Sequence, residues 1–174
     1  MSAFNQRIQP IRDLMKAKGL DAFVLRRNPN LAWAIAGRAH VPTTIDAACF
    51  DLIITHDSAT AVTNVVEAPR LIAEELPSDV NVKTIKWSEG RDSQLPTGAK
   101  VGSDQPGADR IDLGTEIEII RASLIEADVE RFKKICIDAA VALGNAMKHV
   151  VSSDREIDVA GLITHALWQA DLEI

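Results

Sequence analysis

Apolar residues near the start of the chain recur with the spacing of a helix. Four of them are separated by four, three and four positions: Phe4, Ile8, Ile11 and Met15. Residues with this spacing share one helical face, so the pattern predicts a helix with one buried side. Gly19 predicts the end of that helix, because glycine readily adopts the left-handed conformation that closes helices. The apolar run at residues 21–26 then predicts a buried strand.

Short apolar segments continue to about residue 124. Asn28-Pro29-Asn30 predicts a turn, and residues 31–36 predict a short helix that ends at Gly37. The elements expected after it are a strand at 49–55, its hairpin partner at 60–64, a helix at 67–76, a half-exposed strand at 80–87, a brief strand at 100–102 and a helix from Asp112 to about 124. This alternation of helices and strands is typical of an α/β domain over residues 1–124.

The pattern changes after residue 124, where strand signals stop. Apolar residues at helical steps predict one long amphipathic helix: Val129, Phe132, Ile135, Cys136, Ala139, Ala140, Leu143, Ala146, Met147 and Val150. Ser153 and Glu156 have capping-box spacing and predict the start of a second helix. Residues 125–174 therefore form a separate pair of helices. Their apolar stripe has to pack on the first domain, on a second copy of the chain or on further sequence.

Composition and charge narrow the class of protein. The 174-residue chain has 19 basic and 25 acidic side chains, a formal net charge of −6. No segment is strongly basic, so we expect neither a nucleic-acid partner nor a polybasic membrane anchor. The apolar runs are too short to span a membrane and the N-terminus lacks a signal peptide, so we expect a cytoplasmic protein. Cys49 and Cys136 are expected to be buried thiols, with no disulfide or zinc site.

The sequence contains no catalytic constellation that we can assign. It has no glycine-rich nucleotide fingerprint and no serine-elbow motif, and its four histidines lack metal-ligand spacing. Asp104, Asp109 and Asp112 lie among Gly, Pro and Ser residues, which favours turns and a helix cap over a metal cluster. We therefore assign no catalytic and no metal-ligating residue.

One segment, Asn30–His40, carries polar and aromatic residues on a turn, a short helix and a loop. Trp33, Arg38 and His40 stand out, because functional side chains often occupy such loops and a guanidinium group can hold a carboxylate with two hydrogen bonds. The alternative is that Trp33 belongs to the core and Arg38 is solvated.

Several segments resemble the creatinase, Xaa-Pro aminopeptidase and prolidase family. Leu14–Leu25 is similar to the opening of its N-terminal domain, where a helix is followed by Gly-Leu-Asp-Ala and an apolar strand. Asn30–Gly37 resembles the family signature Asn-Leu-x-aromatic-Leu-Thr-Gly, with Trp33 at the aromatic position. Glu126–Val150 and Ser153–Ile157 are similar to the beginning of the pita-bread catalytic domain, with Arg155 where the family usually has Thr.

The resemblance implies a mixed β-sheet flanked by helices over residues 1–124 and the first two helices of an incomplete pita-bread domain over 125–174. It also implies a full-length parent with two divalent metals (Mn, Co or Zn) held by carboxylates and a histidine beyond this sequence. A peptide substrate and a homodimer are implied as well. Trp33, Arg38 and His40 are then candidates for shaping substrate access.

Two functions of different classes follow. In the first, the chain is the non-catalytic N-terminal portion of a metal-dependent Xaa-Pro-type aminopeptidase or dipeptidase, and it serves substrate access and oligomerisation. In the second, it is a stand-alone interaction module with a catalytically inactive creatinase-like fold. A reading frame that continues past codon 174 with the metal ligands distinguishes the first from the second.

Overall fold

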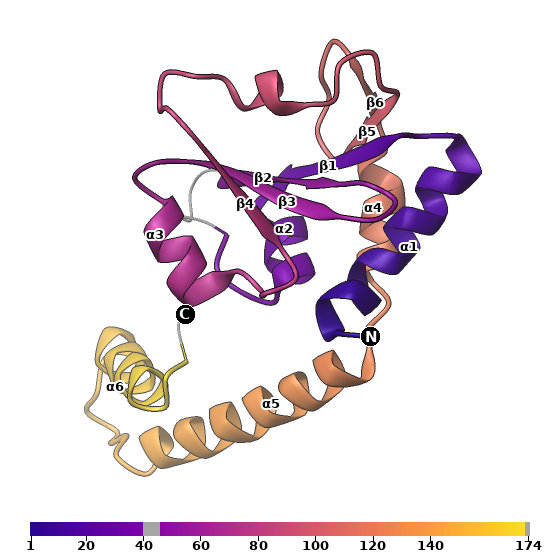
Figure 1. Ribbon diagram of the computed structural model, residues 1–174. Helices are drawn as coiled ribbons and strands as arrows, with labels where there is room; N and C mark the ends of the chain where they lie inside the picture. Colours follow the sequence, from indigo (N-terminus) through magenta and orange to yellow (C-terminus); the bar gives the residue numbers. More distant parts are fainter. Residues whose placement is uncertain (40–45, 173–174) are drawn as a thin grey trace. The chain divides into compact units, whose positions relative to one another are not determined.

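The chain divides into two compact units in the computed structural model, which describes residues 1–39 and 46–172. One unit spans Met1–Ser123 and the other spans Leu124–Ile174 (Figure 1). The first unit contains a β-sheet with helices, and the second is a pair of helices. We call them the sheet unit and the helix pair.

The sheet has six strands in the spatial order β4-β3-β2-β1-β5-β6. Their bounds are Ala22–Arg27 (β1), Ala47–Ile54 (β2), Ala59–Asn64 (β3), Asn81–Ile85 (β4), Val101–Ser103 (β5) and Arg110–Asp112 (β6). The β1–β2 and β2–β3 pairs are antiparallel, whereas β3–β4, β1–β5 and β5–β6 are parallel. The sheet is therefore mixed, as the resemblance implied. The strand β6 was not predicted, since its last residue, Asp112, was assigned to the start of a helix.

The larger core lies between the sheet and three helices: α1 (Ala3–Lys18), α2 (Asn28–Ile35) and α4 (Gly114–Arg121). These helices lie on one side of the sheet (Figure 1). The four apolar residues that predicted the first helix are all buried in this core. Gly19 follows α1 with φ 61°, in the left-handed region, and its N–H donates to the carbonyl of Lys16. The first helix and its glycine stop are confirmed.

A smaller core covers the opposite face of the sheet. It is formed by alternate strand residues: Ala22, Val24, Ile53, Val62, Ile85 and Val101. Leu95 and Ala99 pack against it from the connection between β4 and β5, which includes the 3-10 helix η2 (Arg91–Gln94). One face of the sheet is thus covered by helices, and part of the other face by an irregular segment (Figure 1).

Two local predictions were wrong in the sheet unit. Asn28-Pro29-Asn30 is the first turn of α2 and not a separate turn, because proline is well tolerated there and lacks the N–H that a helix start leaves unpaired. The helix ends at Ala36, which takes the left-handed φ of 56°, one residue before Gly37. The expected helix at 67–76 is present as α3 (Ala68–Arg70), which continues as the π-helix η1 (Leu71–Glu75).

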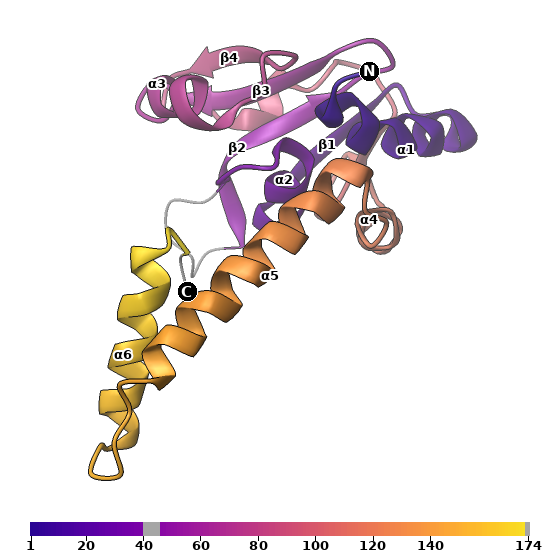
Figure 2. The same cartoon turned by 90° about the horizontal axis from the view of Figure 1, so that it is seen from below.

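The helix pair consists of α5 (Glu126–Met147) and α6 (Glu156–Gln169), which pack side by side as a hairpin (Figure 2). The capping box at the start of α6 differs from the predicted one. The carboxylate of Asp158 accepts the backbone N–H of Arg155 at 3.1 Å, so Arg155 and not Ser153 is the cap residue. Cys136 is exposed on α5 and Cys49 in β2 is half-buried, so the expectation of two buried thiols was wrong.

None of the helices in the described ranges combines the length and the apolar character needed to cross a membrane.

Candidate functional site

Trp33 and Arg38 lie on α2 and on the turn that follows it. Trp33 is half-buried and packs against the larger core, and its indole Nε1 is buried without a hydrogen-bond partner among the described residues. Arg38 is exposed. The third candidate, His40, lies outside the described residues. The structure thus gives Trp33 the core contact that the alternative interpretation expected, and a role of these residues in substrate access stays a prediction.

The turn that presents Arg38 is held by a carboxylate from a distant element. The N–H of Arg38 donates to Oε2 of Glu75, at the end of η1, at 2.6 Å. A Cβ atom at Gly37 would lie 2.9 Å from the same oxygen and 3.1 Å from the Glu75 carbonyl. Glycine is therefore required at position 37 by the close approach of Glu75.

Arg70 links this carboxylate to β2. Its guanidinium group pairs with Glu75 at 3.4 Å and with Glu67 at 3.0 Å, and it lies 3.7 Å from the sulfur of Cys49. Cys49 in turn donates through both its N–H and its Sγ to the carbonyl of Ala39. Burial and the nearby Glu67 raise the pKa of the Cys49 thiol against the opposing effect of Arg70. We call these residues the Glu75 clamp (Cys49, Glu67, Arg70 and Glu75), because they fix the turn on two sides.

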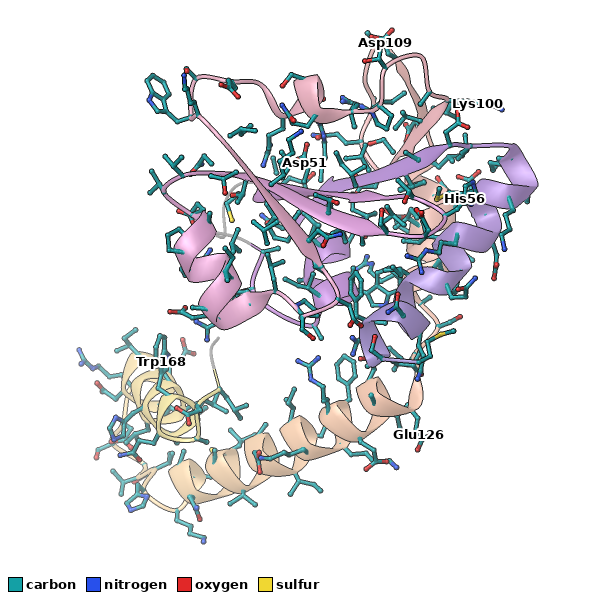
Figure 3. All side chains as sticks on the ribbon, in the orientation of Figure 1. Asp51, His56, Lys100, Asp109, Glu126 and Trp168 are labelled. Atoms are coloured by element: carbon teal, nitrogen blue, oxygen red, sulfur yellow. The ribbon has the colours of Figure 1, made fainter. Side chains whose placement is uncertain are left out.

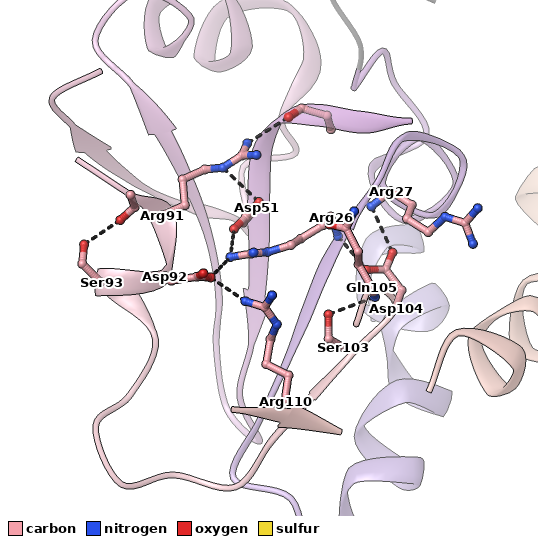
Figure 4. Close-up of polar contacts among 12 residues, drawn as sticks. Arg26, Arg27, Asp51, Arg91, Asp92, Ser93, Ser103, Asp104, Gln105 and Arg110 are labelled. Atoms are coloured by element: carbon pink, nitrogen blue, oxygen red, sulfur yellow. Dashed lines mark hydrogen bonds and ion pairs between the residues drawn. The ribbon is translucent and has the colours of Figure 1, made fainter. Parts of the chain in front are cut away.

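A second polar cluster lies on the face of the sheet that carries the smaller core (Figure 4). We call it the arginine network, and its members are Arg26, Asp51, Arg91, Asp92 and Arg110. Asp51, in the middle of β2, is 1% exposed and pairs with Arg26 at 2.6 Å and Arg91 at 3.2 Å. Asp92 pairs with Arg26 and Arg110. The network therefore joins β1, β2, η2 and β6.

The pKa values of the two carboxylates in the network are shifted in opposite directions. Burial raises the pKa of Asp51, although Arg91 and Arg26 act against it. Burial also acts to raise the pKa of Asp92, but its contacts with Arg26 and Arg110 outweigh it and lower the pKa. Because each carboxylate is already paired with two guanidinium groups, we interpret the network as a structural link between the sheet and its cover, and not as an acid–base site.

The side chain of Asp104 continues the hydrogen bonding between β1 and β5 beyond the last paired residues of the two strands. The strand pairing ends at Val24 and Ser103. Beyond it, the Asp104 carboxylate accepts the N–H groups of Arg26 at 2.9 Å and Arg27 at 3.1 Å, and the Nδ2 group of Asn30 at 2.8 Å. Burial raises the pKa of Asp104, and the hydrogen bond from Asn30 opposes that rise. This aspartate has a structural role that the sequence pattern did not reveal.

The other two aspartates of residues 104–112, Asp109 and Asp112, have different surroundings from Asp104. Asp109 is exposed at the outer tip of the connection between β5 and β6 (Figure 3). Asp112 is the last residue of β6, and its carboxylate accepts the N–H of Gly114. The N-cap residue of α4 is Leu113, so the expectation that Asp112 caps this helix was wrong. Over residues 1–39 and 46–172, no three His, Cys, Asp or Glu side chains are grouped so that they could hold a metal ion.

Solved structures of prolidases share this fold. No protein-family model and no curated protein matches the sequence significantly. The prolidase from Pyrococcus horikoshii matches with a TM-score of 0.74 and 18% identity, over 95% of this chain and 49% of that one. The Xaa-Pro dipeptidase from Bacillus anthracis matches with a TM-score of 0.71 and 12% identity, over 95% and 49%.

An isolated domain matches as well. The creatinase/prolidase N-terminal domain of an X-Pro dipeptidase from Streptococcus pyogenes aligns over 66% of this chain and 98% of that one, with a TM-score of 0.51 and 15% identity. The chain thus has the creatinase/prolidase N-terminal fold, followed by helices that fit part of a catalytic domain. It spans about half the length of the full-length prolidases that it matches.

Proposed function

We propose that this chain is the N-terminal, non-catalytic portion of a cytoplasmic Xaa-Pro-type dipeptidase or aminopeptidase. The observation that carries the proposal is the likeness to full-length prolidases over 95% of this chain, which includes the helix pair as well as the sheet unit. A protein that shared only the N-terminal domain would leave the helix pair without a counterpart.

In this proposal the metal dependence of such an enzyme comes from residues outside this chain. The described residues do not fit a two-metal centre, because no three potential ligands are grouped among them. We therefore place two divalent ions (Mn, Co or Zn) in the other half of the parent protein and assign no ligand here.

In this proposal the sheet unit contributes substrate access and a homodimer contact. Arg38 is the residue that we connect with the peptide, because it is exposed and its turn is fixed by Glu75. An exposed guanidinium group on such a turn can bind a peptide carboxylate with two hydrogen bonds. His40 keeps the role that its sequence position suggested, next to Arg38.

The test is an assay of the full-length parent with a glycyl-proline substrate and added Mn²⁺ or Co²⁺. We expect metal-dependent hydrolysis. Arg38→Ala is expected to raise KM by about tenfold and to leave kcat unchanged, which corresponds to the loss of one charged hydrogen-bonded contact. Lys83→Ala, which removes an exposed cation from β4, is the matched control and should change neither constant.

The stand-alone interaction module remains the second candidate, and it predicts that a second copy of the chain covers the helix pair. The helix pair exposes large apolar side chains, among them Phe132 at 54% and Trp168 at 57%. If the reading frame ends after codon 174, the peptidase proposal fails for this product. Sedimentation of the 174-residue chain then shows whether a second copy covers these residues.

A further inference from the structure

A recess of about 380 Å³ lies in the sheet unit at the carboxyl ends of β3 and β4. These strands are parallel and pair Asn64 with Ile85, so the segments that leave them begin side by side. Ligands of open sheets commonly bind beyond the carboxyl ends of parallel strands. The volume falls within the usual range for small-molecule sites. The recess shares Cys49 with the Glu75 clamp, but neither Arg38 nor Glu75 lines it.

The turn after β4 places charges of both signs on the wall of the recess. The N–H of Glu89 donates to the carbonyl of Lys86 at 2.9 Å, which closes a tight turn. Both side chains line the recess and are exposed. In the part of the chain that the structure describes, neither charge takes part in an ion pair. A cation and an anion are therefore available on one short turn.

Two other residues of the lining, Arg91 and Asn64, supply further donors. Arg91 donates through Nη1 to the carbonyl of Ala48 at 2.9 Å and pairs through Nε with Asp51 at 3.2 Å, so the arginine network fixes its position. This leaves Nη2 for a ligand. Asn64 uses Oδ1 to accept two backbone N–H groups, which leaves its Nδ2 group as a donor. Donors thus outnumber acceptors around the recess.

Trp87 adds an apolar surface between these charges. It lines the recess and is 82% exposed. An indole ring that is left in water gains free energy when an apolar ligand group covers it. Two positive groups, one negative group and an aromatic face match a small zwitterion with an apolar side chain.

We propose that this recess binds a free amino acid with an apolar side chain. Its carboxylate lies between Lys86 and Arg91, its ammonium group faces Glu89, and its side chain packs on Trp87. Binding at this recess involves only its own side chains and does not depend on the proposed peptidase activity. It assigns to the sheet unit a ligand site of its own.

Cys49 reports on occupancy, because it also lines the recess. We would measure by mass spectrometry how fast N-ethylmaleimide alkylates the 174-residue chain, with and without L-proline or L-leucine. Alkylation of Cys49 should slow at least about fivefold at saturation, whereas the exposed Cys136 is an internal control and should react at an unchanged rate. Glycine, which lacks the apolar side chain, and L-prolinamide, which lacks the carboxylate, should protect much less.

Substitutions of the lining residues test which side chains of the recess contact the amino acid. Trp87→Ala and Lys86→Ala should each weaken binding by about tenfold, as measured by calorimetric titration. Lys83→Ala is the matched control, since it removes an exposed lysine of β4 that does not line the recess. Equal protection by L-prolinamide, an unchanged affinity of Trp87→Ala, or no protection of Cys49 in the folded chain would overturn the proposal. None of these results bears on peptide hydrolysis by the parent protein.

Discussion

The sheet unit and the helix pair differ in how much apolar surface they enclose. The largest fully buried side chains, such as Phe23, Phe50 and Ile117, all belong to the sheet unit. In the described part of the helix pair, the buried apolar residues are only Ala142 and Ala146. Its larger apolar side chains are exposed: Leu124, Phe132, Ile135, Ile137, Val141, Leu143, Met147, Val151, Ile157 and Trp168.

The sheet unit is therefore stabilised by its own core, whereas the helix pair is not. Each fully buried large apolar side chain contributes roughly 1.5–3 kcal/mol, and such residues occur only on one side of the division. Two helices that bury mainly alanines gain little from their mutual contact, and isolated helices are marginal in water. The helix pair therefore needs a partner surface, which agrees with its proposed place at the start of a second domain.

The largest expected effect compares two phenylalanines. Phe50→Ala should lower the free energy of unfolding by about 3–5 kcal/mol, because it leaves a cavity in the larger core. Phe132→Ala should change it by less than about 0.5 kcal/mol, since this side chain is 54% exposed. Urea unfolding followed by circular dichroism measures both. An equal loss in Phe132→Ala would show that α5 is covered after all.

The next largest effect compares alanine substitutions at two glycines, one in each unit, which should change the free energy of unfolding in opposite directions. A Cβ atom at Gly102 in β5 would lie 2.8 Å from Leu20 and 2.9 Å from Phe23, whereas one at Gly144 in α5 would meet nothing within 4 Å. Gly102→Ala should cost about 1–3 kcal/mol through overpacking. Gly144→Ala should stabilise its helix by up to about 1 kcal/mol. Thermal unfolding of the two variants tests the signs.

A smaller effect is expected at the Glu75 clamp, within the sheet unit. Glu75→Ala removes the acceptor of the Arg38 N–H, so this amide should exchange its hydrogen roughly tenfold faster. Glu74→Ala changes the neighbouring exposed carboxylate and should leave the exchange rate unaltered. Hydrogen exchange resolved by NMR distinguishes the two. If both variants exchange at the wild-type rate, Glu75 does not hold the turn.

The smallest effect is a change in pH dependence. Because burial raises the pKa of Asp51 above its ordinary value of 3.8, the folded state holds this proton more tightly than the unfolded state. The stability that this proton contributes is complete below pH 3.8 and is lost as the pH rises through the folded pKa. The stability of the wild type relative to Asp51→Asn should therefore fall as the pH rises through this window. Urea midpoints between pH 3.5 and pH 7 test the sign, and a constant difference would contradict it.

Most of the fold could be predicted because its signals are local. The apolar spacing of α1 and α5, the stop at Gly19 and the hairpin of β2 and β3 all depend on neighbouring residues. Three features were missed. β6 is a three-residue strand that pairs with β5, η1 is a π-helical turn within a segment expected to be one helix, and Asn28-Pro29-Asn30 was interpreted as a turn although proline also suits the first turn of a helix.

The candidate site was predicted less completely, because its contacts join segments that are far apart in the sequence. Trp33 and Arg38 were found from their own segment, but Glu75, which holds the turn, lies far along the chain. Asp51 had a visible signal, since it is a lone charge inside the apolar run at 49–55. Its guanidinium partners come from β1 and η2, and no spacing rule connects those segments.

The strand order also determines how the chain can fold while it is being made. The central strand β1 is completed at Arg27, but its neighbour β5 begins only at Val101. Until that segment leaves the ribosome, one edge of β1 has no partner and can pair with another nascent chain. Once α4 has emerged, the sheet unit can close before the helix pair is translated. Aggregation during synthesis should therefore be most frequent when translation pauses between these two strands.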